Sequence, residues 1–200
     1  MATNGYLYYM TAKGLMLNGE IRAQRRERKL PCLLSTISNA GWIDRFDPAG
    51  MDEILEGLYL GGDWAAKNKT KLLGADITHI LTVAPIQPQF PELFEYYLHS
   101  IDDDGYSEDL LSNFPSLHAF IDDALDSGGK ILVHCHAGAS RSATVVVSYC
   151  MRERIFGPQL EPNLRYIVSR RPVVCPHLGF YHQLMRYQEQ LSSPASASSM

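Results

Sequence analysis

Long apolar runs and targeting signals are missing from this sequence of 200 residues. No stretch reaches the roughly 18 consecutive apolar residues that a transmembrane helix needs. Residues 1–19 are too polar and too interrupted to contain the apolar core of a secretion signal. Ala2 stands where N-myristoylation requires glycine, so we expect no such lipid anchor. These absences predict a cytoplasmic protein, with the nucleus as a second location, that does not insert into membranes.

Cysteine is also scarce, with four residues in the chain: Cys32, Cys135, Cys150 and Cys175. Four are few for a disulfide scaffold of this length, and their spacing matches no zinc site. His134, Cys135 and His136 are consecutive and look at first like a metal cluster. Neighbouring side chains on a strand or turn point in different directions, however, which argues against three ligands to one ion. We therefore expect no metal and no other cofactor.

Positive charge is in slight deficit, because 18 Lys and Arg face 22 Asp and Glu and the net charge is −4. Such a mildly acidic chain is a poor candidate for general nucleic-acid binding, so no nucleic-acid partner is expected. The distribution is uneven: residues 1–50 hold seven of the basic residues and four of the acidic ones. The pattern predicts a basic N-terminal extension at residues 1–50, one domain at residues 51–191 and a tail at residues 192–200.

The basic extension has three interpretations that the sequence leaves open. It can be a solvated segment, a contact for nuclear import or an acidic surface, or a docking peptide. The third depends on RRERKLPCLL, where a basic run precedes hydrophobic residues as in peptides that bind mitogen-activated protein kinases. At the other end, residues 192–200 are rich in Ser and Ala, and this composition predicts disorder.

Strand-like and helix-like segments alternate between the extension and the tail. Apolar and β-branched runs predict strands at residues 56–61, 77–84, 94–101 and 130–134. The spacing of apolar residues predicts helices at residues 63–73, 110–127, 143–152, 164–171 and 177–191. Pro158 and Pro162 interrupt a region that otherwise looks helical. The alternation predicts an α/β fold, in which helices flank both faces of a parallel or mixed sheet.

One segment, Lys130–Thr144, has the order strand, tight turn, helix. That order places unpaired backbone N–H groups at the positive end of a helix, which is a ready site for an anion. Gly138 allows the chain to curl so that successive N–H groups point inward. Arg141, in the first helical turn, carries a planar guanidinium that can hold two phosphate oxygens at once. The segment therefore predicts a cradle for a tetrahedral dianion.

Cys135 lies at the start of this cradle. The helix N-terminus, the turn amides and Arg141 would all stabilise a thiolate there, so we expect Cys135 to attack phosphorus and form a phosphocysteine. Ser142 is close enough in sequence to hydrogen-bond the thiolate when it leaves. The other three cysteines are expected to be ordinary small hydrophobic residues.

The segment HCHAGASRS resembles the HCxxGxxR[ST] signature of cysteine-dependent protein phosphatases, and HCxAGxSRS resembles the dual-specificity phosphatases more closely. EGLYLGG, ADITHILTVA and VSRRPVVCPHLGFYHQLMRYQ also fit that family, so the resemblance covers residues 51–191. It implies a twisted central sheet of about five strands flanked by helices. It also implies hydrolysis of phosphotyrosine, phosphoserine and phosphothreonine without a metal. The family often has Asn where this chain has His177, so one loop contact is expected to differ.

The resemblance also implies a general acid, which must protonate the leaving oxygen. Asp102, Asp103 and Asp104 follow a predicted strand and precede the helix that leads back to the cradle. In the family the acid has a fixed offset from a Phe in the next helix, and this offset selects Asp104, ten residues before Phe114. Asp103 and then Asp102 stay as alternatives.

Two further sets of roles come from the resemblance. His134 is expected to support the loop and the thiolate, and the alternative is a packed strand histidine. The residues expected to bind phosphate are His136, Ala137, Gly138, Ala139, Ser140 and Arg141.

Three functions are consistent with these residues. The first is a dual-specificity phosphoprotein phosphatase, for which a mitogen-activated protein kinase is one candidate substrate. The second is the same chemistry on a lipid, glycan or RNA 5′-phosphate, although the loop lacks the Lys that lipid-directed relatives tend to carry. The third is a silent phospho-binding module, which the presence of Cys135, Arg141 and Asp104 together argues against. The sequence leaves the physiological substrate and the oligomeric state open.

Overall fold

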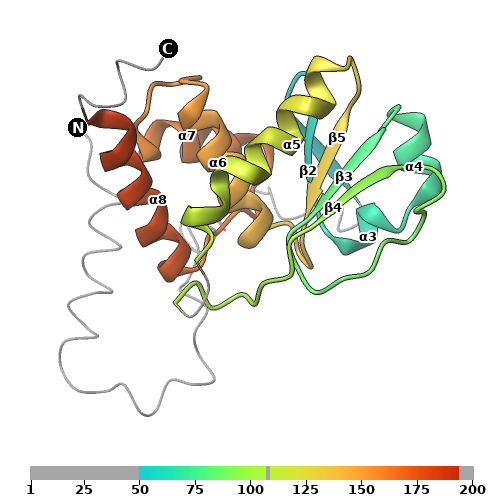
Figure 1. Cartoon of the computed structure of the whole chain (residues 1–200), viewed down its shortest axis with the longest axis horizontal. Coiled ribbons are helices and arrows are strands. Elements are labelled where there is room, and N and C mark those ends of the chain that lie inside the picture. Colours follow the sequence, from blue (N-terminus) through green and yellow to red (C-terminus); the bar gives the residue numbers. More distant parts are fainter. Residues whose placement is uncertain (1–49, 107–108, 194–200) are drawn as a thin grey trace, which may run out of the picture. The chain divides into compact units, whose positions relative to one another are not determined.

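A computed structural model describes residues 50–106 and 109–193 of the chain. Five strands form one sheet in the order β1-β2-β5-β3-β4 (Figure 1). β2, β5, β3 and β4 are parallel, and β1 pairs antiparallel with β2 at one edge. The predicted mixed sheet is thus confirmed. The strands are β1 (Met51–Leu55), β2 (Leu58–Gly61), β3 (His79–Thr82), β4 (Glu95–Leu98) and β5 (Ile131–His134).

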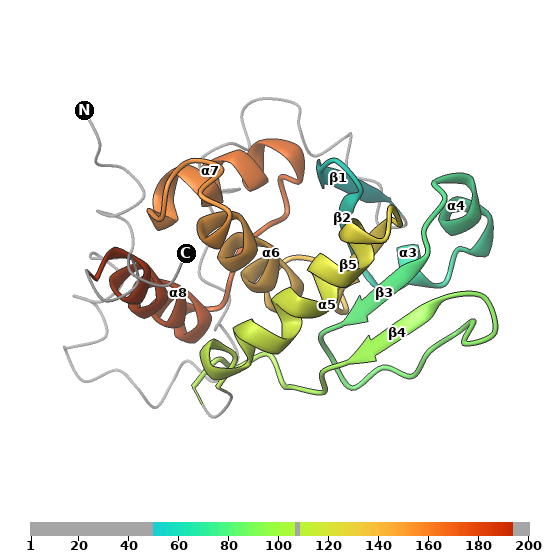
Figure 2. The ribbon, with the colours of Figure 1, turned by 45° about the horizontal axis from the view of Figure 1, so that its top comes forward.

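Helices cover both faces of this sheet. They are α3 (Asp63–Ala66), α4 (Lys69–Gly74), α5 (Phe114–Asp126), α6 (Arg141–Arg152), α7 (Leu160–Arg170) and α8 (Leu178–Ser192), with a 3₁₀ turn, η3 (Leu111–Asn113), before α5. α6 packs against α5, α7 and α8, and Figure 2 shows it between the sheet and α8. No helix within the described ranges is long and apolar enough to cross a membrane.

The core has two halves because neighbouring residues of a strand point to opposite faces. Leu132 of β5 and its partner Ile80 of β3 belong to a buried cluster with Ala66 of α3 and Leu72 of α4. The residues on either side of Leu132 point to the other face, where α5 and α6 contact β5. Figure 1 shows α3 and α4 on one side of the sheet and the longer helices on the other.

The structure departs most from the sequence prediction in three elements. β1 was not predicted, since its sequence MDEIL is partly charged, and its pairing with β2 places it in the sheet. The single helix predicted at residues 63–73 is two helices, because the Asn68 side chain accepts the Lys71 N–H at 3.1 Å and caps a new one. α7 begins at Leu160, because Pro162 lies in its first turn, where the missing N–H has no intrahelical partner to lose. The extension predicted at residues 1–50 lies outside the described residues except for Gly50, and of the tail only Ser192 and Ser193 are described.

The sheet brings the carboxyl ends of its central strands together. Gly61 of β2 and Thr82 of β3 each pair with His134 of β5, so three strands end side by side. In open α/β sheets, ligands bind outside this edge. The segment Cys135–Arg141 leaves β5 at that edge and enters α6.

Candidate active site

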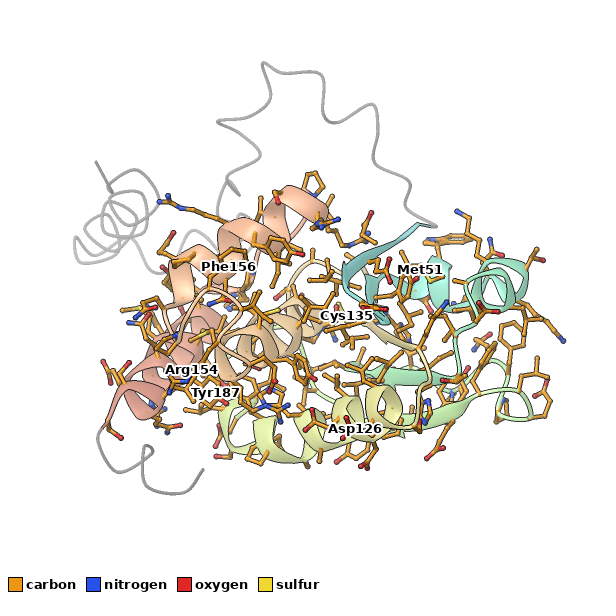
Figure 3. All side chains as sticks on the ribbon, turned by 90° about the horizontal axis from the view of Figure 1, so that it is seen from above. Met51, Asp126, Cys135, Arg154, Phe156 and Tyr187 are labelled. Carbon is orange, nitrogen blue, oxygen red and sulfur yellow. The ribbon has the colours of Figure 1, made fainter. Side chains whose placement is uncertain are left out.

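Cys135 lies in the interior of the domain where β5 ends, as Figure 3 shows. Its side chain is buried, and Ser142 in the first turn of α6 donates a hydrogen bond from Oγ to its Sγ at 3.2 Å. A hydroxyl donor stabilises sulfur as a thiolate more than as a thiol, because a hydrogen bond to an ionised acceptor is the stronger one. The predicted pair of Cys135 and Ser142 is thus brought into contact.

The loop between β5 and α6 packs tightly onto the end of β2. Gly138 has a φ of +66°, and a Cβ at this position would collide with the backbone of Gly61. Glycine is therefore required here both by backbone conformation and by space. On the other side, the Cys175 N–H donates to Ala139 O at 2.7 Å, and the Asp63 N–H donates to His136 O at 2.9 Å.

Arg171 binds the carbonyl groups of the loop between β5 and α6, and the sequence predicted no role for it. It is 1% exposed, and its Nε and Nη2 donate to Gly138 O at 2.9 Å and Ala137 O at 3.0 Å. Its Nη1 donates to Asp52 Oδ2 at 2.7 Å. The only sequence signal was an arginine before Pro172 in a stretch that resembles the family. In each peptide unit the carbonyl and the N–H point in opposite directions. Because the loop carbonyls point toward Arg171, the N–H groups of the same peptide units are left to line the cradle.

Arg141 lies at the front of the cradle and is 5% exposed. Its Nη1 donates to Ile101 O at 3.0 Å, which fixes the guanidinium plane. Its Nε is buried and makes no hydrogen bond within the described part of the chain, and the nearest carboxylate oxygen, Asp103 Oδ1, is 3.8 Å away. A buried cationic N–H without an acceptor is costly, so this atom is suited to an anionic ligand.

The acidic segment before α5 reaches the cradle through Asp103. Ser140 Oγ donates to Asp103 Oδ1 at 2.6 Å and accepts the His177 N–H at 3.0 Å. Asp104 instead has its Oδ1 bonded to the backbone N–H of Tyr106 at 2.9 Å. The structure therefore places Asp103 against the loop and Asp104 in a local turn beside it, and the choice of Asp104 as general acid stays a prediction.

His134 lies behind Cys135 in β5. Its Nε2 is 2.8 Å from Thr82 Oγ1 and its Nδ1 is 3.3 Å from Cys135 O. A carbonyl can only accept, so Nδ1 carries the proton and Nε2 accepts from the Thr82 hydroxyl. Burial lowers the pKa of His134 to about 4, so the ring is neutral at pH 7. It joins β5 to β3 and orients the Cys135 carbonyl, and it brings no positive charge to the thiolate.

The remaining loop residues differ in exposure. His136 and Ala137 are exposed at the rim, whereas Ser140 is buried. Across residues 50–106 and 109–193, no three His, Cys, Asp or Glu side chains gather as a metal site. That no metal or other cofactor is needed stays a prediction. His177 caps α8, accepting the Gly179 N–H at 3.3 Å through Nδ1, and its ring meets Tyr106 edge-on.

Comparison with known proteins shows the family to which this chain belongs. The family model described as dual specificity phosphatase, catalytic domain, matches residues 58–190. The chain belongs to this family. Dual specificity protein phosphatase 1B of Arabidopsis thaliana is 37% identical over 146 residues, which cover 72% of this chain and 86% of that one. The resemblance read from the signature is thereby confirmed, and the homology identifies the chain as a phosphatase-type hydrolase domain.

The chain is also similar to part of a longer protein and to several proteins of known structure. Protein phosphatase Slingshot homolog 3 of Mus musculus is 41% identical over 137 residues, 68% of this chain, but the match spans only 21% of that protein. Among solved structures, the human tyrosine phosphatase-like serine/threonine/tyrosine-interacting protein has 38% identity and a TM-score of 0.66, covering 72% of this chain and 98% of that one. Human DUSP28 has 33% identity and a TM-score of 0.66, covering 72% and 95%.

Proposed function

We propose that this protein is a phosphoprotein phosphatase that hydrolyses phosphotyrosine, phosphoserine and phosphothreonine through a phosphocysteine. The observation that carries the proposal is the cradle itself. Cys135 is buried, precedes the N-terminus of α6 and accepts a hydrogen bond on its sulfur from the Ser142 hydroxyl. Arg141, the first residue of that helix, is also buried, and its Nε has no hydrogen-bond acceptor among the described residues. A bound phosphate dianion would accept from that Nε and from the loop amides, with its phosphorus in front of the sulfur.

The proposed reaction has two steps, each with a bond that forms and a bond that breaks. In the first, the Cys135 thiolate attacks phosphorus, the ester P–O bond breaks, and the leaving oxygen takes the proton of Asp104. In the second, water attacks the phosphocysteine and gives a proton to the Asp104 carboxylate, and the P–S bond breaks. Ser142 stabilises the departing thiolate, and Arg141 with the loop amides stabilises the charge on the phosphoryl oxygens in both steps.

Phosphate release from a small aryl phosphate, measured with a chelator present, tests this mechanism. We expect wild-type activity to persist with the chelator and to vanish in Cys135→Ser. An inactive but folded wild-type protein would overturn the proposal and favour a silent phospho-binding module. The likeness to a phosphatase-like interacting protein makes that second candidate worth the control.

The identity of the acid is tested by comparing Asp104→Asn with Asp103→Asn. General acid catalysis contributes about 10²- to 10⁴-fold, and we expect a loss in that range for Asp104→Asn with a poor leaving group. Asp103→Asn removes the negative charge that faces Ser140 and Arg141, so we expect a smaller loss for every leaving group. The opposite order of the two losses would make Asp103 the acid.

For the substrate class, we propose a phosphoprotein, with a mitogen-activated protein kinase as a first candidate, in the cytoplasm or the nucleus. Support comes from relatives such as MAP kinase phosphatase with leucine-rich repeats protein 2 of Dictyostelium discoideum, 35% identical over 140 residues, although the match covers only 20% of that protein. A panel of phosphopeptides, a phosphoinositide, a phosphoglucan and an RNA 5′-phosphate tests the class. Preference for any of the last three would overturn the phosphoprotein proposal.

A further inference from the structure

The segment that carries the candidate acid is anchored to α8 by one buried side chain, Gln183. This residue is 8% exposed and bonds three backbone groups at once. Its Nε2 donates to Gly105 O at 2.9 Å. Its Oε1 accepts the N–H groups of Leu110 and Leu111, each at 2.9 Å. One amide therefore joins Gly105 to Leu110 and Leu111, which follow it in the chain.

The bond to Gly105 continues to the candidate acid through a single peptide unit. The carbonyl of Gly105 and the N–H of Tyr106 belong to the same planar group. The carbonyl accepts from Gln183 Nε2, and the N–H donates to Asp104 Oδ1 at 2.9 Å. The orientation set by Gln183 on one side of the plane is therefore transmitted to the Asp104 carboxylate on the other.

The backbone around this peptide unit is specialised for close contact with α8. Gly105 has a φ of +65°, and a Cβ on it would lie 2.6 Å from the backbone nitrogen of Phe180. A Cβ on Gly179 would collide with the Gly105 carbonyl in the same way. Two glycines thus face each other where the loop meets the helix, and this leaves no room for the Gly105 carbonyl to move away from Gln183.

We propose that Gln183 is a positioning residue for the general acid, acting on Asp104 through the Gly105–Tyr106 peptide unit. This proposal rests on the proposed function, since it concerns the same reaction. Gln183 does not touch the substrate. It keeps the acid at one distance and angle from the leaving oxygen, and proton donation depends steeply on that geometry.

The test exploits the dependence of proton donation on the leaving group. An aryl phosphate with an acidic phenol expels its leaving group unaided, whereas a weakly acidic phenol or an alkyl phosphate needs the acid. In Gln183→Ala we expect kcat/KM, which reports the step in which the leaving group departs, to fall by roughly ten-fold or more for the poor leaving groups and by less than about three-fold for the best one. A purely structural role would lower all the rates by the same factor.

Gln188→Ala is the matched control, because Gln188 lies on the same helix and its Oε1 accepts the Leu160 N–H at 2.7 Å, away from the acid. We expect it to show no selectivity for leaving groups. Gln183→Glu separates the two sets of hydrogen bonds made by Gln183, because a carboxylate still accepts from the N–H groups of Leu110 and Leu111 but cannot donate to Gly105 O. We expect this variant to show the same selective loss as Gln183→Ala.

Gly105→Ala provides an independent route if Gln183→Ala does not fold. Its added methyl group pushes the loop from α8 while leaving Gln183 intact, and we expect the same selective loss. Wild-type levels of activity on poor leaving groups in Gln183→Glu, or equal losses across the series in both Gln183→Ala and Gly105→Ala, would overturn the proposal. An inactive wild-type protein in the same series would instead overturn the proposed function.

Discussion

Two buried arginines belong to the loop between β5 and α6 or contact it, and their hydrogen bonds differ. Arg171 has Nε, Nη1 and Nη2 all bonded to oxygen atoms of the protein. Arg141 differs, because its Nη1 donates to Ile101 O but its Nε makes no hydrogen bond within the described residues. The comparison separates a guanidinium with three nitrogens bonded to the protein from one with an unbonded Nε, which we propose binds the phosphate, although both are buried and both lie within reach of an aspartate.

The largest effect that this comparison predicts is loss of activity in Arg141→Lys. An ammonium cannot present two N–H groups in one plane to the phosphoryl oxygens, so transition-state stabilisation is lost. We expect kcat/KM for an aryl phosphate to fall by about 10²- to 10³-fold, the range found when one such donor is removed. Unfolding in urea, measured alongside, should change far less than in the Arg171 variant described next.

Arg171→Leu is expected to act mainly on stability. The change leaves two loop carbonyls without their donor and Asp52 without its partner. Asp52 is partly exposed, so the main cost is that of the two loop carbonyls left without a donor, roughly 3 kcal/mol together, which urea unfolding would measure. Arg170→Leu is the matched control, because Arg170 is exposed and lies over the Tyr166 ring. Unchanged stability with lost activity would mean that Arg171, like Arg141, serves the ligand.

The same contrast shows how far the sequence could be interpreted. A phosphate-binding role for Arg141, which stays a prediction, could be proposed from local order alone: a strand, a turn and a helix in one short segment. Arg171 was missed because its partners are 33 to 119 residues away in the chain, and only the folded sheet brings them together. Gln183 was missed for the same reason, since its partners lie 72 to 78 residues before it. Contacts of this kind leave no periodic trace in a sequence.

The prediction of the fold had a similar limit. The buried strands β3 and β5 were predicted because their apolar runs are determined by burial on both faces. β1 was missed because its place depends on pairing with β2, and the helix at residues 63–73 was too long because one side chain, Asn68, starts a second helix. The general acid is the least predictable part of the site. Asp102, Asp103 and Asp104 are adjacent and chemically identical, so the backbone conformation of their loop decides which carboxylate faces the cradle.

A smaller effect is expected at the sulfur itself, where Ser142→Ala removes the hydroxyl donor. The hydrogen bond to Cys135 matters most when the thiolate leaves, so the phosphocysteine should break down more slowly. A loss of about 1.4 kcal/mol, within the usual range for a bond to a charged group, is ten-fold in rate. Rapid mixing with an aryl phosphate should then show a burst of phenol followed by a slow phase.

Ser148→Ala is the control for that experiment, because Ser148 is buried in the same helix but faces His118, 2.8 Å away. We expect no burst in this variant. A Ser142→Ala enzyme with wild-type kinetics and no burst would place the stabilisation of the leaving thiolate on the loop amides and Arg141 instead.

The smallest predicted effect concerns pH and compares His134, behind the loop, with His118, in the helical layer on α5. Burial lowers the pKa of His134 to about 4 and that of His118 to about 3. In the unfolded chain both rings take up a proton near pH 6.5, whereas in the folded protein they stay neutral until far lower pH. Each ring therefore contributes stability that is fully present above pH 6.5 and is lost as the pH falls toward the folded value.

Between pH 7.5 and 5.5, each histidine should thus remove about 1 kcal/mol from the free energy of unfolding. Urea unfolding of His118→Asn at both pH values should show a decrease that is smaller than the wild-type decrease by this amount. His134→Asn should show the same change in pH dependence together with lost activity, because His134 also orients the Cys135 carbonyl. The exposed His136→Asn serves as the control for stability. A wild-type pH dependence in both variants would mean that the two rings take up a proton at the same pH in the folded and unfolded states, and His134 would then bring positive charge to the thiolate below about pH 6.5.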